Sequence, residues 1–366
     1  MIRVLTIAGT RPEAIKMAPV IKALEGDSRF DSRVLVTAQH REMLDQVLEF
    51  FAIVPDYDLD VMRRGQTLSK ITNKVLTGVT EILEFVQPDV VLVHGDTTTT
   101  FAAALAAFYQ EVNVGHVEAG MRTGDIRQPF PEEMNRILVA RLARWHFAPS
   151  QECVDNLLRE GISRDAIIRT THNTGVDALI FAKEILEGFD REASPADADN
   201  ALLVTAHRRE SWGAPMREIF SAIAEIACQK SDLTIEVATH ANPLVADDAD
   251  AILGSIPNVS LLGPQNYADF VEKMSRARLI LSDSGGIQEE GPTLGVPVIV
   301  LRNKTEYHEL LDEGVVILGG TEKEGIVKVT MGVLANKELQ STTKEFARRR
   351  SSKNSVPDIL DALARG

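Results

Sequence analysis

Short apolar runs rich in β-branched residues alternate with longer stretches of helical periodicity along the first half of the chain. Five of these runs predict strands, at residues 4–8, 33–37, 90–94, 114–117 and 145–148. Runs that are apolar on both faces and separated by helices are typical of a parallel sheet that is covered on both sides. The pattern therefore predicts a doubly wound α/β domain.

A second series of apolar runs repeats this arrangement in the second half. It predicts strands at residues 201–205, 234–238, 259–262, 279–281, 296–301 and 315–318. A chain of 366 residues is longer than one hydrophobic core usually serves, so two domains are expected. We predict an α/β fold with two Rossmann-like domains, residues 1–172 and 173–350, that face a cleft. Residues 351–366 form a terminal amphipathic helix that packs back on the first domain.

Composition limits the classes of function. The net charge is −14, which leaves no basic surplus for binding a nucleic acid backbone. The two cysteines, Cys153 and Cys228, lie far apart without metal-ligand spacing and are interpreted as small buried residues in a reducing compartment. The apolar N-terminal run is too short for a signal peptide or a membrane span. These features predict a cytoplasmic protein that binds neither nucleic acid nor membrane.

A glycine motif follows the strand predicted at residues 279–281. Ser284, Gly285 and Gly286 lead from this strand into a helix. Glycine lets the backbone approach a phosphate, and the first N–H groups of the helix point toward the ligand. Glu290, farther along, could accept hydrogen bonds from a ribose diol. An ordinary strand-to-helix turn would have the same local sequence, because short glycine motifs occur often by chance.

Charged residues also gather after the strands of the first half. Arg11 and Lys16 lie near the start of a helix, where cations oppose the helix dipole unless an anion binds between them; the alternative is ordinary surface charge. Asp96 follows the strand at 90–94 and could instead cap the next helix. Glu132 and Arg136 have the i,i+4 spacing that also suits a surface salt bridge.

Three carboxylates, Asp96, Glu118 and Glu132, are expected at neighbouring strand ends. Crowded carboxylates repel one another, so we expect at least one raised pKa and a group that transfers protons near neutral pH. No histidine pattern for a metal accompanies them, and we predict acid/base chemistry without a metal.

Polar residues follow strands in the second half as well. His207 and Arg208 come after the strand at 201–205, and His240 follows the next strand. A single histidine in such a loop is more often structural than catalytic. Tyr267 could stack on a flat base or simply pack. Because ligands of open parallel sheets bind at the carboxyl ends of strands, these clusters predict a cleft between the two domains.

Together, these segments resemble the non-hydrolysing UDP-N-acetylglucosamine 2-epimerases over most of residues 1–302. The resemblance rests on long motifs: Gly-Thr-Arg-Pro-Glu-Ala-Ile-Lys at 9–16, Thr-Ala-Gln-His-Arg-Glu-Met-Leu-Asp-Gln at 37–46, His-Gly-Asp-Thr-Thr-Thr-Thr at 94–100, Arg-Thr-Gly-Asp at 122–125, Pro-Glu-Glu-Met-Asn-Arg at 131–136, His-Arg-Arg-Glu at 207–210 and Asp-Ser-Gly-Gly-Ile-Gln-Glu-Glu at 283–290.

The resemblance implies the two-domain glycosyltransferase-B architecture and a cytoplasmic homodimer. It implies an isomerase that interconverts UDP-GlcNAc and UDP-ManNAc without a metal or redox cofactor. In this family UDP leaves by anti elimination to give bound 2-acetamidoglucal, and UDP adds back after carbon 2 is reprotonated on the other face. Since the hydrogen on carbon 2 is barely acidic, the carbon–oxygen bond must break well ahead of proton removal.

The resemblance also implies roles for residues. It assigns diphosphate binding to Arg11, Ser284, Gly285 and Gly286, ribose binding to Glu290, and the uracil-side wall to Gln265, Tyr267 and Phe270. It assigns proton transfer to Asp96, Glu118 and Glu132, with Lys16, Arg136 and His207 beside them. A second UDP-GlcNAc, which activates some bacterial members, would bind at Gln39, His40, Arg208 and His240, although Gly65 stands where one regulated group carries arginine.

Two segments depart from the family pattern. Residues 305–309 read Thr-Glu-Tyr-His-Glu where the family usually reads Thr-Glu-Arg-Pro-Glu, and residues 348–354 replace Asn-Pro-Tyr-Gly-Asp-Gly. Losing one charge-assisted phosphate contact typically costs about 1.5 to 3 kcal/mol, enough to change affinity or substrate. The alternatives are therefore an enzyme for a modified UDP-sugar, a hydrolysing 2-epimerase, a glycosyltransferase of similar architecture, or a non-catalytic UDP-sugar sensor.

Overall fold

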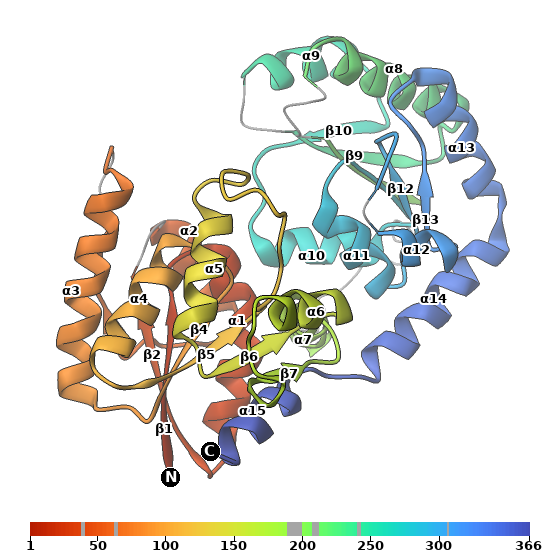
Figure 1. The fold of residues 1–366 in the computed structure, drawn as a ribbon. Coiled ribbons are helices and arrows are strands. Elements are labelled where there is room, and N and C mark those ends of the chain that lie inside the picture. The colour runs from red at the N-terminus through yellow and green to blue at the C-terminus, as the bar shows by residue number, and fades with distance from the viewer. Residues whose placement is uncertain (38–40, 62–64, 189–199, 207–211, 240–242, 306) are drawn as a thin grey trace. The chain divides into compact units, whose positions relative to one another are not determined.

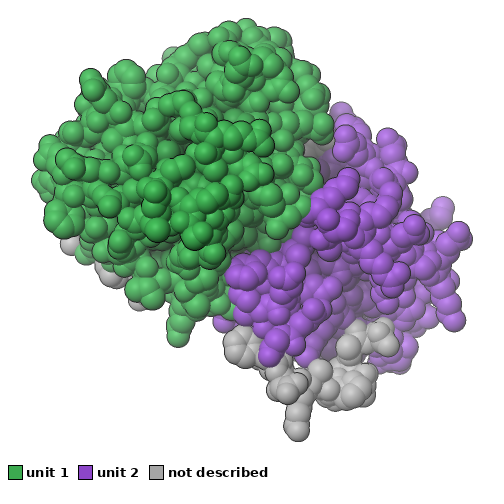
Figure 2. All heavy atoms as spheres, turned by 90° about the horizontal axis from the view of Figure 1, so that it is seen from below, with its two compact units in different colours: residues 1–178, 354–366 green, residues 179–353 purple. Residues whose placement is uncertain are grey.

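The computed structural model describes residues 1–37, 41–61, 65–188, 200–206, 212–239, 243–305 and 307–366, and the side chains of residues 41, 42, 243 and 244 are not described. Contacts divide the chain into two compact units (Figure 2). Unit 1 contains residues 1–178 and 354–366, and unit 2 contains residues 179–353. The chain passes from unit 1 to unit 2 within one helix and returns before its last helix.

Unit 1 is built on a seven-stranded parallel sheet in the order β3-β2-β1-β4-β5-β6-β7 (Figure 1). The strands are β1 Ile2–Ala8, β2 Phe30–Val36, β3 Tyr57–Asp58, β4 Val90–His94, β5 Asn113–Val117, β6 Trp145–Ala148 and β7 Ile167–Arg169. The helices are α1 Arg11–Gly26, α2 Arg41–Phe50, α3 Leu68–Val86, α4 Thr98–Tyr109, α5 Glu132–Leu142, α6 Gln151–Arg159, α7 Thr174–Gly188 and α15 Val356–Ala364, with the 3₁₀-helix η1 at Arg164–Ala166.

Unit 2 is built on a six-stranded parallel sheet in the order β10-β9-β8-β11-β12-β13. Its strands are β8 Ala201–Thr205, β9 Thr234–Ala238, β10 Val259–Leu262, β11 Leu279–Ser282, β12 Val298–Val300 and β13 Val316–Leu318. Its helices are α8 Ala214–Gln229, α9 Pro243–Leu253, α10 Tyr267–Arg276, α11 Gly285–Thr293, α12 His308–Asp312, α13 Lys323–Ala335 and α14 Lys337–Ser351. The predicted fold class of two parallel α/β sheets is confirmed.

Local sequence explains where the first helix starts. Thr10 accepts a hydrogen bond from the backbone N–H of Glu13, and Glu13 reaches back to the N–H of Thr10, which completes a capping box. Pro12 stands in the first turn, where its missing N–H costs nothing. The loop between β1 and α1 is therefore rigid.

The strand order locates a binding edge in each unit. The order reverses at β1 and β4 in unit 1, and at β8 and β11 in unit 2. In open parallel sheets the loops that leave the two strands on either side of this reversal separate and leave a crevice for ligands. The motifs after β1, β4 and β11 lie in such loops.

The terminal helix α15 packs against α1 and β7 of unit 1. Its apolar side chains Ile359, Leu360 and Leu363 are buried. Within the described parts of the chain, no helix combines the length and apolar character needed to cross a membrane.

Two features differ from the predictions made from the sequence. Cys153 is buried, but Cys228 is exposed because it lies on the outer face of α8, while Ile226 and Ala227 beside it face the core. The edge strands β3 and β7 are additional to the five strands predicted for the first half.

Candidate active site

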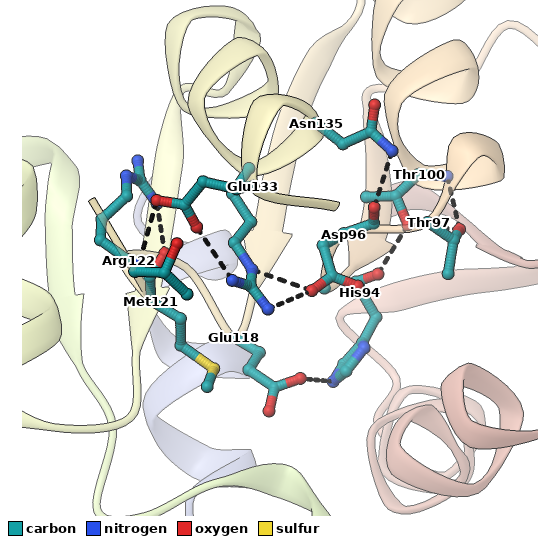
Figure 3. A network of polar contacts seen from close by, with 12 residues as sticks. His94, Asp96, Thr97, Thr100, Glu118, Met121, Arg122, Glu133 and Asn135 are labelled. Carbon is teal, nitrogen blue, oxygen red and sulfur yellow. Dashed lines mark hydrogen bonds and ion pairs between the residues drawn. The ribbon is translucent and has the colours of Figure 1, made fainter. Parts of the chain in front are cut away.

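Glu118 follows β5 at the carboxyl edge of the sheet and is held from three directions. Lys16 Nζ from α1 lies 2.7 Å from its Oε1 and 2.8 Å from its Oε2. His94 Nε2 from β4 lies 3.1 Å from Oε2, and the Asn173 amide donates a hydrogen bond to Oε1. Figure 3 shows the His94 ring and the Glu118 carboxylate pointing toward one another. The Glu118 side chain is only 10% exposed.

The backbone at Glu118 adopts an uncommon conformation. Its φ is +64°, in the left-handed region that is costly for a residue with a β-carbon. Such a conformation persists where the surrounding contacts determine it, and it often accompanies functional residues. Here it directs the side chain toward Lys16 and His94 rather than along the strand.

The charge environment lowers the pKa of Glu118. Burial raises the pKa of this carboxyl, but the positive charge of Lys16, the neighbouring His94 and the hydrogen bonds from Lys16 and Asn173 outweigh it and bring the pKa to about 2. Of the three carboxyls, at least one of which was predicted to have a raised pKa, Glu118 has a lowered pKa, because its near neighbour is a cation from α1 rather than a second carboxylate.

Asp96 forms an ion pair with Arg136. Arg136 Nε and Nη2 lie 2.8 and 2.6 Å from Asp96 Oδ2, and the Asn135 amide donates a 2.8 Å hydrogen bond to the Asp96 carbonyl. Asp96 does not cap the following helix, so that alternative is wrong: Thr97 caps α4 by accepting from the N–H of Thr100. The carboxylate of Asp96 is left facing α5.

Arg136 does not form the surface pair with Glu132 that the i,i+4 spacing suggested. Its Nη1 lies 3.0 Å from Glu133 Oε2, and Glu133 Oε1 accepts from the backbone N–H groups of Thr123 and Gly124. Burial raises the pKa of Glu133, but these hydrogen bonds and the Arg136 charge outweigh it and lower the pKa below its usual value. Glu132, the first residue of α5, is half-buried beside this network.

Glu133 and Asn135 belong to the network but were not singled out from the sequence. Glu133 pairs with Arg136, and Asn135 binds the Asp96 carbonyl; Figure 3 shows Glu133 and Asn135 beside Asp96. Glu133 is nearly inaccessible, at 1% exposure. Burial of the Glu133 side chain marks it as part of this network. The sequence alone does not show that burial.

Glu13 joins the loop after β1 to the start of α4. Its Oε2 accepts from the N–H groups of Gly9 and Thr10 at 3.0 and 2.7 Å, and its Oε1 accepts from the hydroxyls of Thr97 and Thr100 at 2.8 and 2.9 Å. Burial raises the pKa of Glu13 despite these four donors. This residue was also missed as part of the site's framework.

Three buried histidines, His94, His116 and His146, lie on the adjacent strands β4, β5 and β6. Burial lowers the pKa of His94 and His116 to about 4 and that of His146 to about 3. At neutral pH these rings are therefore uncharged. The His116 ring nitrogen Nε2 lies 2.7 Å from the Gly95 carbonyl and fixes the loop that carries Asp96.

Arg11 is the first residue of α1 and is partly buried. Its Nη1 donates to Met43 Sδ over 3.9 Å. The helix start and a neighbouring guanidinium together form the kind of environment that binds an anion.

In unit 2, the motif after β11 forms the start of α11. Ser284 is the residue before the helix, and its own N–H donates to Ser282 Oγ at 3.0 Å. A β-carbon added at Gly286 would lie 3.5 Å from Glu290 Oε1, so the Glu290 carboxylate lies over this glycine. Because glycine has no side chain, a ligand can approach the backbone at the start of α11 closely.

The remaining predicted ligands of unit 2 lie around α10. Gln265 donates its amide to the Gly263 carbonyl at 2.9 Å, and Tyr267 and Phe270 lie on the first turn of α10, partly buried. Five further residues predicted from the sequence lie outside the described residues: Gln39, His40, His207, Arg208 and His240.

The segment that departs from the family pattern has its own contacts. Thr305 donates its hydroxyl to Gln288 of α11, and the N–H of Tyr307 donates to the Thr305 hydroxyl at 3.2 Å. Arg350, from the second departing segment, pairs with Glu289 of α11. Both departing segments therefore contact and brace α11, the helix that begins at Gly285.

The family model described as UDP-N-acetylglucosamine 2-epimerase matches residues 22–363. The UDP-N-acetylglucosamine 2-epimerase of Escherichia coli K12 is 50% identical over 99% of this chain and 98% of its own length. The chain belongs to the UDP-N-acetylglucosamine 2-epimerase family.

Other family members give the same result. The UDP-N-acetylglucosamine 2-epimerase of Bacillus subtilis is 43% identical over 98% of this chain and 95% of its own length. The crystal structure of UDP-GlcNAc 2-epimerase from Neisseria meningitidis bound to UDP-GlcNAc matches with a TM-score of 0.83, 44% identity and full coverage of both chains. The predicted family, its isomerase class and the glycosyltransferase-B-like fold are confirmed.

Proposed function

We propose that this member of the family interconverts UDP-GlcNAc and UDP-ManNAc through 2-acetamidoglucal. The bond between carbon 1 and the diphosphate oxygen breaks, and its electron pair leaves with UDP. A carboxylate takes the proton from carbon 2, which completes the double bond between carbons 1 and 2. An acid then returns a proton to carbon 2 on the opposite face, and the UDP oxygen re-forms the bond to carbon 1.

The observation that carries this proposal is the ionised, immobilised carboxylate of Glu118. A pKa of about 2 makes Glu118 a weak base, which would be poorly suited to removing an unactivated carbon-bound proton. Departure of UDP first leaves positive charge at carbon 1 and makes the neighbouring hydrogen far more acidic. A fixed, fully ionised carboxylate then stabilises that positive charge and accepts the proton without reorganising.

We assign the second proton-transfer function to the neighbouring carboxylates. Asp96 is partly exposed and paired with Arg136, and Glu132 begins the same helix that carries Arg136. Arg136 holds Asp96 in place as Lys16 holds Glu118, and His207 completes the group assigned from the family motif. A second carboxylate in addition to Glu118 is required because the two proton transfers occur on opposite faces of carbon 2.

We assign UDP binding to Arg11 and to residues of unit 2. The N–H groups at the glycine-containing start of α11 suit the diphosphate, and the carboxylate of Glu290 suits the ribose hydroxyls. Gln265, Tyr267 and Phe270 provide an amide and two aromatic rings for the uracil. Binding of the departing diphosphate lowers the barrier because it stabilises charge that develops only in the transition state.

The reaction can be tested in deuterated water. The protein is incubated with UDP-GlcNAc and the sugar is followed by NMR. We expect UDP-ManNAc and UDP-GlcNAc that both carry deuterium at carbon 2. Deuterated free ManNAc together with UDP would instead indicate hydrolysis, the alternative that Tyr307 and His308 raise. Absence of exchange with UDP still bound would refute the proposal for this substrate.

Asp96→Asn tests the proton-transfer assignment. The substitution keeps the shape of the side chain but removes its charge and basicity, so we expect deuterium exchange to fall by at least about 100-fold, typical of losing a general acid or base. UDP affinity, measured by calorimetry, should stay within about twofold because the assigned UDP ligands are elsewhere. Asp155→Asn, an exposed carboxylate on α6, is the control. Equal exchange in the two variants would remove Asp96 from the mechanism.

We also propose that the protein acts as a cytoplasmic homodimer. Three exposed aromatic side chains support an interface on unit 1: Phe85 at the end of α3, and Phe108 and Tyr109 at the end of α4, are 78%, 56% and 63% exposed. The two helices pack side by side, so these rings share one end of the pair. Aromatic side chains are enriched at interfaces, and sedimentation of a Phe85→Ser variant tests whether a dimer dissociates.

A further inference from the structure

Asn173 stands immediately before α7, in the segment through which the chain leaves unit 1. Its Oδ1 accepts a 2.7 Å hydrogen bond from the N–H of Gly175, as a residue that caps a helix start does. Its Nδ2 donates to Oε1 of Glu118. One side chain therefore both caps α7 and contacts a carboxylate that lies 55 residues earlier in the sequence.

The two contacts fix the orientation of the amide. The oxygen must face the backbone N–H of Gly175, so the nitrogen must face the carboxylate. Aspartate, serine and threonine also cap helices, but aspartate has no proton to donate when ionised. Among the common capping residues, asparagine is the one that joins a cap oxygen to an NH₂ donor.

The backbone on the N-terminal side of Asn173 is held by a buried polar cluster. The N–H of His172 donates to Ser355 Oγ at 2.9 Å, and Ser355 Oγ donates to the His172 carbonyl at 2.9 Å. The N–H of Ser355 donates to Asp177 Oδ1 at 3.1 Å. Ser355 is fully buried, and His172 and Asp177 are 7% and 6% exposed.

This cluster connects two distant parts of the chain. His172 and Asp177 precede the passage from unit 1 to unit 2, and Ser355 follows the return to unit 1. Thr171 adds a peripheral contact, since its N–H and hydroxyl both donate to Asp358 of α15. The backbone around Asn173 is thus supported on both sides, and the position of its amide does not depend on solvent.

We propose that Asn173 is a positioning residue for Glu118: its amide fixes the rotation of the carboxylate that takes part in proton transfer at carbon 2. The inference rests on the proposed function, because it concerns the same carboxylate. The groups that face Glu118 are Lys16 from α1, His94 from β4 and Asn173. Lys16 contacts both oxygens, whereas His94 contacts Oε2 and Asn173 contacts Oε1, so Asn173 is the neighbour that fixes the Oε1 side of the carboxylate.

Two substitutions at Asn173 separate positioning from capping. Asn173→Ala removes both contacts. Asn173→Asp keeps the cap, since aspartate accepts from Gly175 as well as asparagine does and its charge suits the helix dipole, but it places a second carboxylate against Glu118. Thr171→Ala, which removes a contact two residues away without touching Glu118, is the matched control.

We expect activity to depend on the NH₂ donor and not on the cap. Asn173→Asp keeps the stabilising cap, but repulsion between its carboxylate and Glu118 opposes this gain, so melting temperatures serve to confirm that both variants fold. The kcat of Asn173→Asp for deuterium exchange should be as low as that of Asn173→Ala or lower. Both should fall about 10- to 100-fold, the loss expected for one hydrogen bond to a charged group. KM, UDP affinity and the Thr171→Ala activity should stay within about twofold.

The outcomes distinguish this inference from the proposed function. If Asn173→Asp restores the wild-type kcat along with the cap, Asn173 is only a capping residue and the inference is overturned. If both Asn173 variants exchange at the wild-type rate while Glu118→Gln does not, the inference fails and the function stands. If the wild-type protein itself shows no exchange, the proposed function fails first.

Discussion

Replacing Lys16 with methionine would test how strongly Glu118 depends on its cation. Methionine keeps most of the length and volume of lysine but carries no charge. The attraction between unit charges 2.7 Å apart is about 6 kcal/mol at an effective dielectric constant of about 20. Desolvation of both groups cancels part of it, and removing one partner of a buried pair typically costs 3 to 5 kcal/mol. Because Lys16 is 30% exposed, we expect the low end, about 3 kcal/mol.

The pH dependence of this loss follows from the pKa of Glu118. In the wild-type fold this pKa, about 2, lies below the ordinary value of 4.5, so the ionised carboxylate stabilises the fold above pH 4.5, and this contribution is lost as pH falls toward 2. Without Lys16, burial becomes the dominant influence and raises the pKa. The variant should therefore be least stable relative to wild type at neutral pH, and the two proteins should converge in acid.

The measurement needs a probe of unit 1 alone. The sequence has two tryptophans, Trp145 in unit 1 and Trp212 in unit 2, so a Trp212→Phe background leaves Trp145 as the reporter. Urea unfolding followed by its fluorescence at pH 7.5 and pH 5 would give both free energies. Lys16→Arg, which keeps the charge, is the control.

A second substitution sharpens the test. Adding Glu118→Gln to Lys16→Met removes the unpaired charge, so the double variant should regain most of the lost stability and none of the exchange activity. A Lys16→Met protein as stable as wild type at both pH values, with unchanged exchange activity, would refute the ion pair as the cause of the low pKa.

Two further predictions concern the groups around this pair. Glu133→Gln keeps the acceptor for Thr123 and Gly124 but turns an amide toward Arg136, so the unfolding free energy should fall by about 1.5 to 3 kcal/mol. The neighbouring control Glu132→Gln should change the unfolding free energy by less than about 0.5 kcal/mol. Equal changes in the two variants would contradict the buried network around Glu133. The pKa values of His94, His116 and His146 are lowered in the fold, so as pH falls below 6.5 the unfolded chain binds protons that the folded chain does not. The contribution of these histidines to the unfolding free energy should therefore be complete above pH 6.5. It should fall by about 1.4 kcal/mol per histidine for each pH unit from 6.5 toward 4. Urea unfolding of unit 1 between pH 7.5 and 5.5 checks this, and a flat profile would show that the rings already bind protons in the fold.

The strands that could be predicted are those with apolar side chains on both faces. The central strands β1 and β4 are buried along almost their whole length, and such runs stand out in the sequence. The edge strands β3 and β7 have two and three residues, and neither forms an apolar run long enough to detect. Short edge strands depend on their single neighbour for hydrogen bonds, which is tertiary information that no local pattern carries.

The site shows a similar division. Motifs identified Asp96, Glu118 and Arg136, because their residue types and positions after strands are visible in the sequence. Partners could not be assigned in the same way. Spacing along a helix allowed Arg136 to pair with Glu132, yet it pairs with Glu133 one turn away and with Asp96, 40 residues away. Arg136 pairs with Glu133 rather than with Glu132 because two backbone N–H groups already hold the Glu133 carboxylate in place.

The pKa of Glu118 is a case that reasoning from residue types does not decide. Three nearby carboxylates suggested repulsion, but Lys16, 102 residues earlier, lies against both oxygens of Glu118. Its cation and the hydrogen bonds outweigh burial, which acts in the other direction. A sequence indicates candidate ionisable groups for a site, whereas the sign of a pKa shift depends on which of them touch.

The two segments that depart from the family pattern raise a related question about α11, the helix proposed to bind the diphosphate. Arg350 pairs with Glu289 of this helix, while its guanidinium lies 5.6 Å from the centre of the Phe346 ring. Thr305 donates to Gln288 one residue earlier. Loss of a charged ligand from residues 305–309 would weaken UDP binding directly, but bracing of α11 from two sides keeps its first N–H groups in place. This arrangement favours a change in affinity over a change in reaction, since the carboxylates proposed to act at carbon 2, Asp96, Glu118 and Glu132, belong to unit 1 and match the family motifs.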